Sequence, residues 1–352
     1  MYDMNSSLPL ATRPDNWPEP EQLGFGQYLG SWMVVADHTA AGWSAATALR
    51  LGDGHTPTAS AGVQYGFTVF EGLKTFRAKD GTAHLFRPYE HAARLRQSCL
   101  RLGMPVVSDE LFVEACRMVS KIHDTLLPPH GRGSLYLRPT VTADEEALGF
   151  RVASRHRFSV LVTPSSDPVL KTYRLWAERE LTRAAPGGIG AAKTGGNYAA
   201  GMLGLLKSRE RGCDDVCWLD SATHSKLGEA GTMNLFVEID HRLCTPPLDG
   251  TILAGITRDT LMRLAKEDDV TVEERELPIE ELITLERAGR VGCAFGLGTA
   301  ARLVRVRELV DGPRSIVFKD VGRAEHYFRR LKAVQEGTTE AHPEWRVPVE
   351  AG

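Results

Sequence analysis

The stretch RAAPGGIGAAKTGGN, residues 183–197, decides how the rest of this chain is interpreted. It places one lysine, Lys193, between two glycine-rich runs, and glycine lets the backbone pass close to a bound group because no Cβ intervenes. Three interpretations compete for such a lysine. It is a solvated residue on a flexible loop, part of a phosphate-binding loop, or an amine that bonds covalently to a carbonyl cofactor.

The phosphate-loop interpretation fits the residues around Lys193 poorly. That pattern requires a glycine directly before the lysine, whereas Ala192 occupies this position. The covalent interpretation requires a desolvated and positioned amine. The rest of the chain has to decide between this interpretation and the flexible surface loop.

Length and composition limit the function classes. With 352 residues, of which 42% are hydrophobic, the chain can bury a sizeable core and is expected to form two domains. Its formal net charge of -3, with both signs interspersed, offers no basic face for nucleic acid and no polybasic tract for a membrane. No signal-peptide pattern opens the sequence, and no apolar run approaches the length of a membrane span. We expect a cytoplasmic protein with neither nucleic acid nor membrane as partner.

The 6 cysteines are scattered along the chain, and no two of them form a C-x-x-C pair. This spacing is typical of reduced, mostly buried small residues and not of a disulfide framework or a zinc site. We therefore expect no metal.

The first half of the chain mixes strand and helix patterns. β-branched and aromatic residues dominate residues 62–77, and a turn at 79–81 follows them, which predicts a hairpin. Pro88 suits the first turn of a helix, and Ser108 is typical of the N-cap of a second helix. Two further strands are predicted at 134–141 and 157–164.

The second half contains further helix and strand signals. Asn197 is predicted to cap a helix that runs to Arg211, Thr257 to cap a second helix, and Pro278 to begin a third. Strands are predicted at 215–220, 234–240 and 294–306, and a last helix at 322–335.

These patterns predict an α+β fold with two domains. A shift in composition near residues 164–172 marks the boundary, so we expect a first domain at 1–165, a linker at 166–176 and a second domain at 177–352. Residues 1–22, rich in Pro, Asn and Ser, are expected to form an arm with little regular structure on the surface or on a partner subunit.

Three other features suit an anion. The helix start at 255–258 presents backbone N–H groups and a positive dipole end, residues 298–300 offer N–H groups and a hydroxyl, and Arg94 can make a bidentate contact. Taken singly, the helix start is more often an ordinary capped helix, residues 298–300 are more often a simple turn, and Arg94 is more often a solvated arginine. A pyridoxal phosphate enzyme needs them together with a lysine and a carboxylate for the pyridine nitrogen.

The motifs that carry a family resemblance extend over roughly residues 24–306. They are YGFTVFEGLKTFR from Tyr65, LFRPYEHAARL from Leu85, SLYLRPTVTADEEALGF from Ser134, RAAPGGIGAAKTGGNYAAG from Arg183, LGEAGTMNLF from Leu227, TPPLDGTILAGITR from Thr245 and FGLGTA from Phe295. With them the chain resembles the branched-chain amino acid aminotransferases of the fold-type IV group. The resemblance implies a small α/β N-terminal domain, a larger C-terminal pseudo-barrel domain, pyridoxal 5'-phosphate and a homodimer whose pockets use both subunits.

The same resemblance implies roles around the cofactor. Lys193 would bond to it and move the proton of the substrate Cα, Tyr198 would bind its phenolic oxygen, and Glu229 would pair with its pyridine nitrogen. The residues implied to hold the phosphate are Arg94, Ile256, Thr257 and Thr299.

A substrate pocket is implied in the same way. Tyr65 and the turn at Thr299 and Ala300 would bind the α-carboxylate, and Arg138 would bind the γ-carboxylate of glutamate. One pocket would then accept both apolar and acidic amino acids. The other residues implied to line it are Phe25, Phe70, Tyr136 and Phe150. On their own, Phe70 and Tyr136 are equally typical of core residues.

Four features depart from the family pattern. Residues 26–33, GQYLGSWM, put Ser31 and Trp32 where relatives usually have a Thr-Asp-His-Met sequence, and the linker is short and lacks a Gly-x-aromatic lid. Phe150 stands where relatives usually carry a small aliphatic residue. The sequence ARLV after Ala300 lacks the C-x-x-C pair of some members. These departures concern the substrate and not the cofactor chemistry.

The sequence therefore predicts transamination between a branched-chain or related hydrophobic L-amino acid and 2-oxoglutarate, giving the 2-oxo acid and L-glutamate. The alternatives on this fold are an enzyme for an unusual amino acid of a specialised pathway, a D-amino acid aminotransferase and an aminodeoxychorismate lyase-like enzyme. The Tyr136-x-Arg138 pair and the GGNYAAG run favour the L-branched-chain group. A nucleotide-binding protein would need glycine at position 192, and intact Lys193, Tyr198 and Glu229 argue against a non-catalytic relative.

Overall fold

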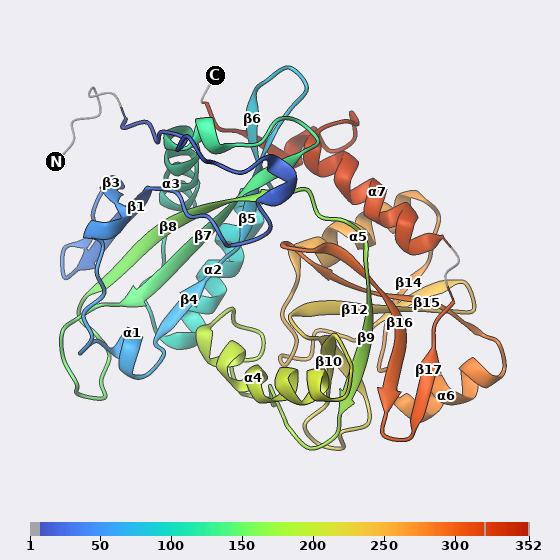
Figure 1. Cartoon of the computed structure of the whole chain (residues 1–352). Coiled ribbons are helices and arrows are strands. Elements are labelled where there is room, and N and C mark those ends of the chain that lie inside the picture. Colours follow the sequence, from blue (N-terminus) through green and yellow to red (C-terminus); the bar gives the residue numbers. More distant parts are fainter. Residues whose placement is uncertain (1–7, 320–321, 351–352) are drawn as a thin grey trace. The chain divides into compact units, whose positions relative to one another are not determined.

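The computed structural model describes residues 8–319 and 322–350, which fall into two compact units (Figure 1). Unit 1 consists of the described residues up to Pro168, of Ala192–Gly195 and of those from Ala333 onward. Unit 2 consists of Val169–Ala191 and the described part of Gly196–Lys332. The linear division expected at 1–165 and 177–352 did not anticipate that the segment around Lys193 and the C-terminal residues belong to unit 1.

Nine strands of the described residues form the antiparallel sheet of unit 1, in the order β18-β6-β5-β7-β8-β1-β2, with β3 beside β1 and β4 beside β7. The strands are β1 (Trp32–Thr39), β2 (Gly42–Trp43), β3 (Thr47–Arg50), β4 (Thr68–Phe70), β5 (Leu73–Arg77), β6 (Ala83–Phe86), β7 (Gly133–Ala143), β8 (His156–Ser166) and β18 (Arg346–Pro348). The hairpin predicted around residues 79–81 is confirmed as β5 and β6, and the two strands predicted after it are β7 and β8.

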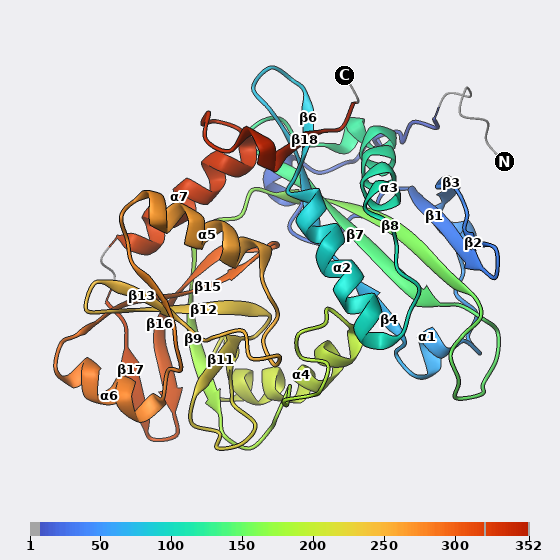
Figure 2. The ribbon, with the colours of Figure 1, turned by 180° about the vertical axis from the view of Figure 1, so that it is seen from behind.

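Two long helices, α2 (Pro88–Leu102) and α3 (Asp109–Ile122), lie side by side on one face of this sheet (Figure 2). Pro88 begins α2 as predicted, and the Ser108 hydroxyl caps α3 by accepting the Leu111 N–H at 3.2 Å. Their apolar stripes bury Leu95 and Phe112 against the sheet and complete the core of unit 1. The helices of unit 1 are α1 (Ala61–Gln64), α2 (Pro88–Leu102) and α3 (Asp109–Ile122), with short 3-10 turns at Pro20–Gln22, Leu51–Asp53, Asp124–Leu126 and Pro343–Trp345.

The sheet of unit 2 closes on itself, as the resemblance to a pseudo-barrel domain implied. Its strands follow the order β11-β10-β9-β16-β15-β12-β13-β14, and β11 also pairs with β12, so six of them form a ring. The strands are β9 (Lys171–Glu178), β10 (Asp215–Leu219), β11 (Leu227–Ala230), β12 (Met233–Ile239), β13 (Arg242–Thr245), β14 (Val272–Glu274), β15 (Val291–Gly298), β16 (Arg302–Asp311) and β17 (Arg314–Val317), which extends β16.

Four helices accompany this sheet: α4 (Gly195–Glu210), α5 (Ile256–Glu267), α6 (Ile279–Arg287) and α7 (Arg323–Glu336). Pro278 precedes α6 as predicted, but two predicted caps are wrong. Asn197 lies inside α4 and donates its side-chain amide to the Ile189 carbonyl at 2.8 Å, and the N-cap of α5 is Gly255 rather than Thr257.

Two predicted segments also differ from the structure. The single strand expected at 294–306 is two antiparallel strands, β15 and β16, because the chain reverses at residues 299–301. Part of the linker expected at 166–176 is regular structure, since β9 begins at Lys171.

The N-terminal arm is described from residue 8, and residues 1–7 of it lie outside the described range. The arm rests on unit 1, where the Ala11 N–H donates to the Ile122 carbonyl at 2.8 Å and the Thr125 hydroxyl donates to the Ala11 carbonyl at 2.7 Å. All six cysteines are unbridged and buried, as predicted. Within residues 8–319 and 322–350, no helix has the length and apolar character needed to cross a membrane.

Candidate active site

Lys193 is fixed to a strand of unit 1 through its main chain. Its N–H donates to the Ser98 hydroxyl on α2 at 2.9 Å, and its carbonyl accepts the Phe70 N–H at the end of β4, also at 2.9 Å. The next residue repeats the attachment, since the Thr194 hydroxyl donates to the Thr68 carbonyl at 2.7 Å. The interpretation of Lys193 as part of a flexible surface loop is therefore wrong.

The amine of Lys193 lies in an environment that disfavours its charge. Burial lowers the pKa of Lys193, the charge of Arg94 lowers it further, and the Glu71 carboxylate opposes both effects. The Nζ atom lies 5.0 Å from the centre of the Phe70 ring. A lysine of this kind is neutral, and thus nucleophilic, at a lower pH than a solvated one.

Three of the predicted pocket residues join Phe70 in one cluster. The Phe25 and Tyr136 rings meet edge to face at 4.9 Å, and the Arg138 guanidinium stacks 4.8 Å from the Phe70 ring and 5.4 Å from the Tyr136 ring. Gly72 makes room for this arrangement, because a Cβ at that position would fall 1.9 Å from the Tyr136 hydroxyl. Phe70 thus contacts Lys193 directly, and Arg138, Tyr136 and Phe25 join it through successive contacts within unit 1.

Arg138 carries an unused donor into this cluster. One of its amino groups donates to the Tyr136 hydroxyl at 3.3 Å, but its buried Nε has no hydrogen-bond partner within the described part of the chain. Leaving such a donor without an acceptor costs about 1 to 3 kcal/mol. A carboxylate is the group that best satisfies a guanidinium edge, so the geometry suits an acidic ligand.

Tyr65 and Phe150 form a second cluster, which is exposed. Their rings meet edge to face at 5.7 Å, and the Tyr65 hydroxyl donates to the Leu148 carbonyl at 2.5 Å. Phe150 is 90% exposed, and its neighbours Leu148 and Val152 are also exposed. Among the described contacts, none links this cluster to Lys193.

Unit 2 places Glu229 in a hydrogen-bonded group of its own. Glu229 lies on β11, is buried, and pairs with Arg183. Its other oxygen accepts the Asn234 side-chain amide at 3.4 Å, and that amide also donates to the Leu253 carbonyl at 2.9 Å. The sequence assigned no role to Arg183 or Asn234, although both lie inside the quoted motifs. β11 itself was missed because only four residues form it.

The other predicted residues of unit 2 lie at element ends. Ile256 and Thr257 form the first turn of α5, and the N-cap before them, Gly255, has no side chain with which to cap that turn. Thr299 and Ala300 lie in the reversal between β15 and β16, and Tyr198 lies in the first turns of α4.

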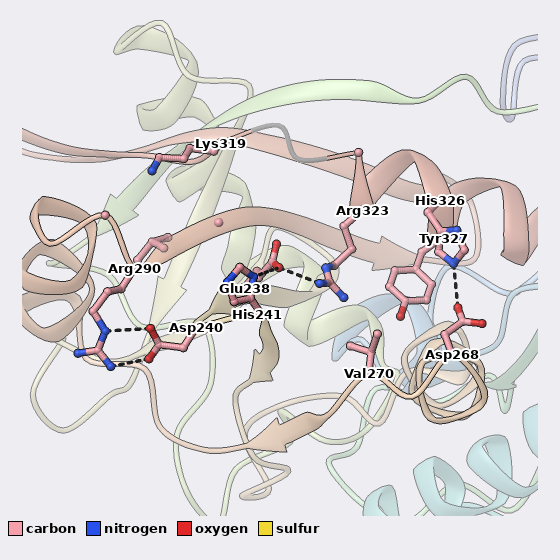
Figure 3. Close-up of a pocket in the computed structure, with 14 residues that line it drawn as sticks. Glu238, Asp240, His241, Asp268, Val270, Arg290, Lys319, Arg323, His326 and Tyr327 are labelled. Carbon is pink, nitrogen blue, oxygen red and sulfur yellow. Dashed lines mark hydrogen bonds and ion pairs between the residues drawn. The ribbon is translucent and has the colours of Figure 1, made fainter.

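A cavity of about 1160 Å³ on unit 2 contains none of these residues (Figure 3). The ion pairs in its lining include Arg290 with Asp240, Arg323 with Glu238, His241 with Glu238, and His326 with Asp268. Size alone therefore does not mark the site, and the lysine cluster remains the candidate on chemical grounds.

Comparison with known proteins agrees with the predicted family. The family model for class IV amino-transferases matches residues 68–309. A curated relative, the branched-chain-amino-acid aminotransferase of Mycolicibacterium smegmatis, is 38% identical over 90% of this chain and 89% of the relative.

Solved structures show the same fold. The branched-chain amino acid aminotransferase of Escherichia coli, 27% identical, superposes with a TM-score of 0.73 over 90% of this chain and 99% of that one. The branched-chain amino acid aminotransferase of Thermobaculum terrenum, solved in its PLP form, is 20% identical and superposes with a TM-score of 0.70 over 90% of this chain and 98% of that one. At that identity the likeness concerns the fold alone.

Proposed function

The chain belongs to the class IV aminotransferase family, and from this premise we propose that it exchanges an amino group between a branched-chain or related hydrophobic L-amino acid and 2-oxoglutarate. The observation that carries the proposal is the position of Lys193, held by its main chain in a cluster that lowers the pKa of its amine. The unused Nε of Arg138 in the same cluster supports an acidic partner substrate. The relatives named above support the branched-chain class of amino donor.

The residues present fit pyridoxal 5'-phosphate as cofactor. Lys193 offers an amine for its aldehyde, Arg94 offers a cation, and the start of α5 offers the N-terminal end of a helix whose N-cap is a glycine. When bound, this cofactor supplies an electron sink that stabilises a carbanion at the substrate Cα. The solved structure of the same fold in its PLP form shows that this fold can hold the cofactor.

Each residue then has a defined task in the proposal. Lys193 takes the proton from the substrate Cα and passes it on to the cofactor. Glu229, which pairs with Arg183, holds a proton on the pyridine nitrogen. The proposed phosphate donors are Arg94, Ile256, Thr257 and Thr299, and Tyr198 binds the phenolic oxygen.

On the substrate side, Tyr65, Thr299 and Ala300 are proposed to bind the α-carboxylate. Phe25, Phe70 and Tyr136 provide apolar surface for a hydrophobic side chain, and Arg138 binds the second carboxylate of glutamate. This division lets one pocket alternate between an apolar and an acidic substrate.

A homodimer is part of the same proposal. Phe150, Leu148, Val152 and Tyr65 leave apolar surface exposed in one chain, and contiguous patches of this kind mark protein contacts. If a second copy of the chain covers these residues, Phe150 would reach the substrate pocket of that second copy. Sedimentation of the purified protein should therefore give twice the mass of the chain, and Phe150→Asp should shift the protein toward monomer.

Spectroscopy and a panel of amino donors test the function. The purified protein should show the visible absorbance of bound pyridoxal phosphate and lose it when leucine, isoleucine or valine is added. Recovery of the band with 2-oxoglutarate would complete the cycle. A protein that stays colourless with added cofactor contradicts the proposal.

The same panel distinguishes the alternatives. Reaction only with D-amino acids, or elimination without an amino acceptor, would select the D-aminotransferase or the lyase. An enzyme for an unusual amino acid is favoured by one observation, the large side chain at Phe150, and would respond to few of the branched-chain donors. A cytoplasmic location stays a prediction.

A further inference from the structure

Glu71, for which the sequence predicted no role, lies at the centre of the cluster around Lys193. Its carboxylate is completely buried and accepts four hydrogen bonds. Arg94 donates its Nε to Oε1 at 2.6 Å and an amino group to Oε2 at 2.8 Å, and Oε2 also accepts the His91 Nδ1 at 2.7 Å and the Gly72 N–H at 3.1 Å. Four hydrogen bonds from three residues thus hold this carboxylate in place.

The backbone couples Glu71 to Lys193. Phe70, the residue before Glu71, donates its N–H to the Lys193 carbonyl, while Glu71 donates its own N–H to the Pro139 carbonyl at 2.7 Å. The lysine and the carboxylate are thus both attached at the end of β4. A shift of this short segment would move the two groups together.

One face of α2 provides the matching partners. His91, Arg94 and Ser98 are spaced by three and four residues, so they project from the same side of the helix. His91 and Arg94 bind Glu71, and Ser98 binds the main chain of Lys193. The helix and the end of β4 therefore hold Lys193 and Arg94 in a fixed relation.

We propose that Glu71 is a positioning residue, which fixes the Arg94 guanidinium in one orientation beside Lys193 and is itself braced by His91. This inference rests on the proposed function, because Arg94 is a proposed phosphate ligand. Glu71 is not a catalytic residue, since it acts through Arg94.

The charge of Glu71 gives the arrangement a second consequence. Burial alone would raise the pKa of Glu71, but the charge and hydrogen bonds of Arg94 hold it well below its usual value, so the group is ionised. Burial lowers the pKa of His91, although Glu71 opposes this, so its ring is a neutral donor. The other groups that act on the Lys193 amine are Tyr136 and the guanidinium of Arg138. Without Glu71, the guanidinium charges of Arg94 and Arg138 would act on the amine without the carboxylate that opposes them.

Two measurements on the full-length protein test the proposal. The first is the pH dependence of Lys193 acylation by acetic anhydride in cofactor-free protein, read by peptide mass spectrometry. Glu71→Gln should move its midpoint to lower pH by about one unit, because an opposite charge near the amine is lost. Glu71→Asp keeps the charge and should leave the midpoint near the wild-type value.

The second measurement is the dissociation constant of pyridoxal 5'-phosphate. Both Glu71→Gln and Glu71→Asp should weaken binding about tenfold or more, because Arg94 loses its fixed orientation. In an Arg94→Gln background the same changes should have little further effect, since residues that act through one partner are not additive. The matched control is Glu90→Gln, a charge-neutralising change on the same helix at a carboxylate that pairs with Arg87.

The outcomes separate this inference from the proposed function. Acylation needs neither cofactor nor substrate, so it reports on Glu71 even if the protein proves not to bind pyridoxal phosphate. An unchanged midpoint in Glu71→Gln, or a loss of cofactor affinity that is equally large without Arg94, would overturn the positioning role. If Glu71→Gln fails to fold, Glu71→Asp with the Arg94→Gln cycle gives the decision.

Discussion

The six predicted pocket residues that belong to unit 1 lie in two clusters, and these clusters differ in how far they are buried. Tyr136, in the cluster around Lys193, is 5% exposed and packs against Phe25 and Arg138. Phe150, in the other cluster, is 90% exposed and packs mainly against Tyr65. The first cluster is packed within one chain, whereas the second leaves its apolar surface exposed. Residues predicted for one pocket are therefore not all packed together in the isolated chain.

The secondary structure explains this difference. Tyr136 and Arg138 lie on β7 two residues apart, so the strand directs both to the same face of the sheet. Phe150 lies in the loop between β7 and β8, which no such periodicity constrains. The strand residues can be placed from their spacing alone, but the loop residue can be placed only by seeing the fold.

The largest effect should come from removing the amine of Lys193 from the buried cluster. We expect Lys193→Ala to lower transamination by more than about 10³-fold, because one change removes both the covalent link and the proton carrier. The fold should persist, since Lys193 is anchored by its main-chain N–H and carbonyl. Half-reaction kinetics with leucine and far-ultraviolet circular dichroism measure the two effects. If Lys193→Ala turned over like wild type, the chemistry would have to lie elsewhere.

The second largest effect should come from Glu229, and it tests whether unit 2 contributes to the same chemistry. Glu229→Gln should retain the cofactor but lose on the order of 10²-fold in rate, because a neutral amide cannot hold a proton on the pyridine nitrogen. A suitable control is Glu238→Gln, since Glu238 is also a buried carboxylate paired with an arginine, on the neighbouring strand β12. Equal rate losses in the two variants would show that folding rather than chemistry is affected.

Much of the fold follows from local patterns in the sequence. Pro88, Ser108 and Pro278 mark helix starts correctly because caps and proline restrict the backbone locally. The errors at Asn197 and Thr257 arise where a glycine stands at the start of the helix. Gly195 is the first residue of α4 and Gly255 is the N-cap of α5, so each helix begins earlier than the polar residue indicates.

The candidate site could be predicted only in part, because its contacts are long-range. Lys193 and Arg94 stand in recognisable motifs, but their shared partner Glu71 is 23 residues from Arg94 in sequence. A carboxylate inside an apolar strand region was the available signal, since such a residue is rarely buried without a partner. Nothing in the sequence indicates that the carboxylate would meet both His91 and Arg94.

A third, smaller effect concerns Arg138 in the cluster around Lys193, which should distinguish acidic from apolar substrates. Arg138→Met should raise the KM for 2-oxoglutarate by about 10- to 100-fold, because a hydrogen bond to a charged group is worth about 1.5 to 3 kcal/mol. The half-reaction with leucine should change little, since leucine has no second carboxylate. Arg157→Met, at an arginine of β8 that pairs with Asp37, is the matched control. An equal loss with leucine would place Arg138 outside substrate recognition.

The smallest effect concerns the exposed cluster and decides whether it belongs to a pocket. The family resemblance implies a small aliphatic residue at position 150, and a larger side chain such as Phe150 leaves less room for a branched substrate. If a partner chain's pocket receives it, Phe150→Val should raise kcat/KM for leucine and isoleucine relative to 2-aminobutyrate by about tenfold, the order of discrimination that one misfitting group provides. Activity with glutamate should stay nearly constant, because Arg138 and not residue 150 binds its side chain.

Exposure makes this prediction sharper than the sequence alone allowed. The alternative that Phe150 packs in the core is wrong for the isolated chain, since the side chain is 90% exposed. Thermal stability of the protomer should therefore change little, by less than about 0.5 kcal/mol, so a shift in donor preference cannot be attributed to unfolding. Val152→Ala, a change at another exposed apolar residue of the same loop, should leave the preference unaltered. The contrary outcome is that the protein sediments as a dimer while the ratio of leucine to 2-aminobutyrate activity stays the same in Phe150→Val. In that case Phe150 belongs to the contact between chains and not to the substrate pocket.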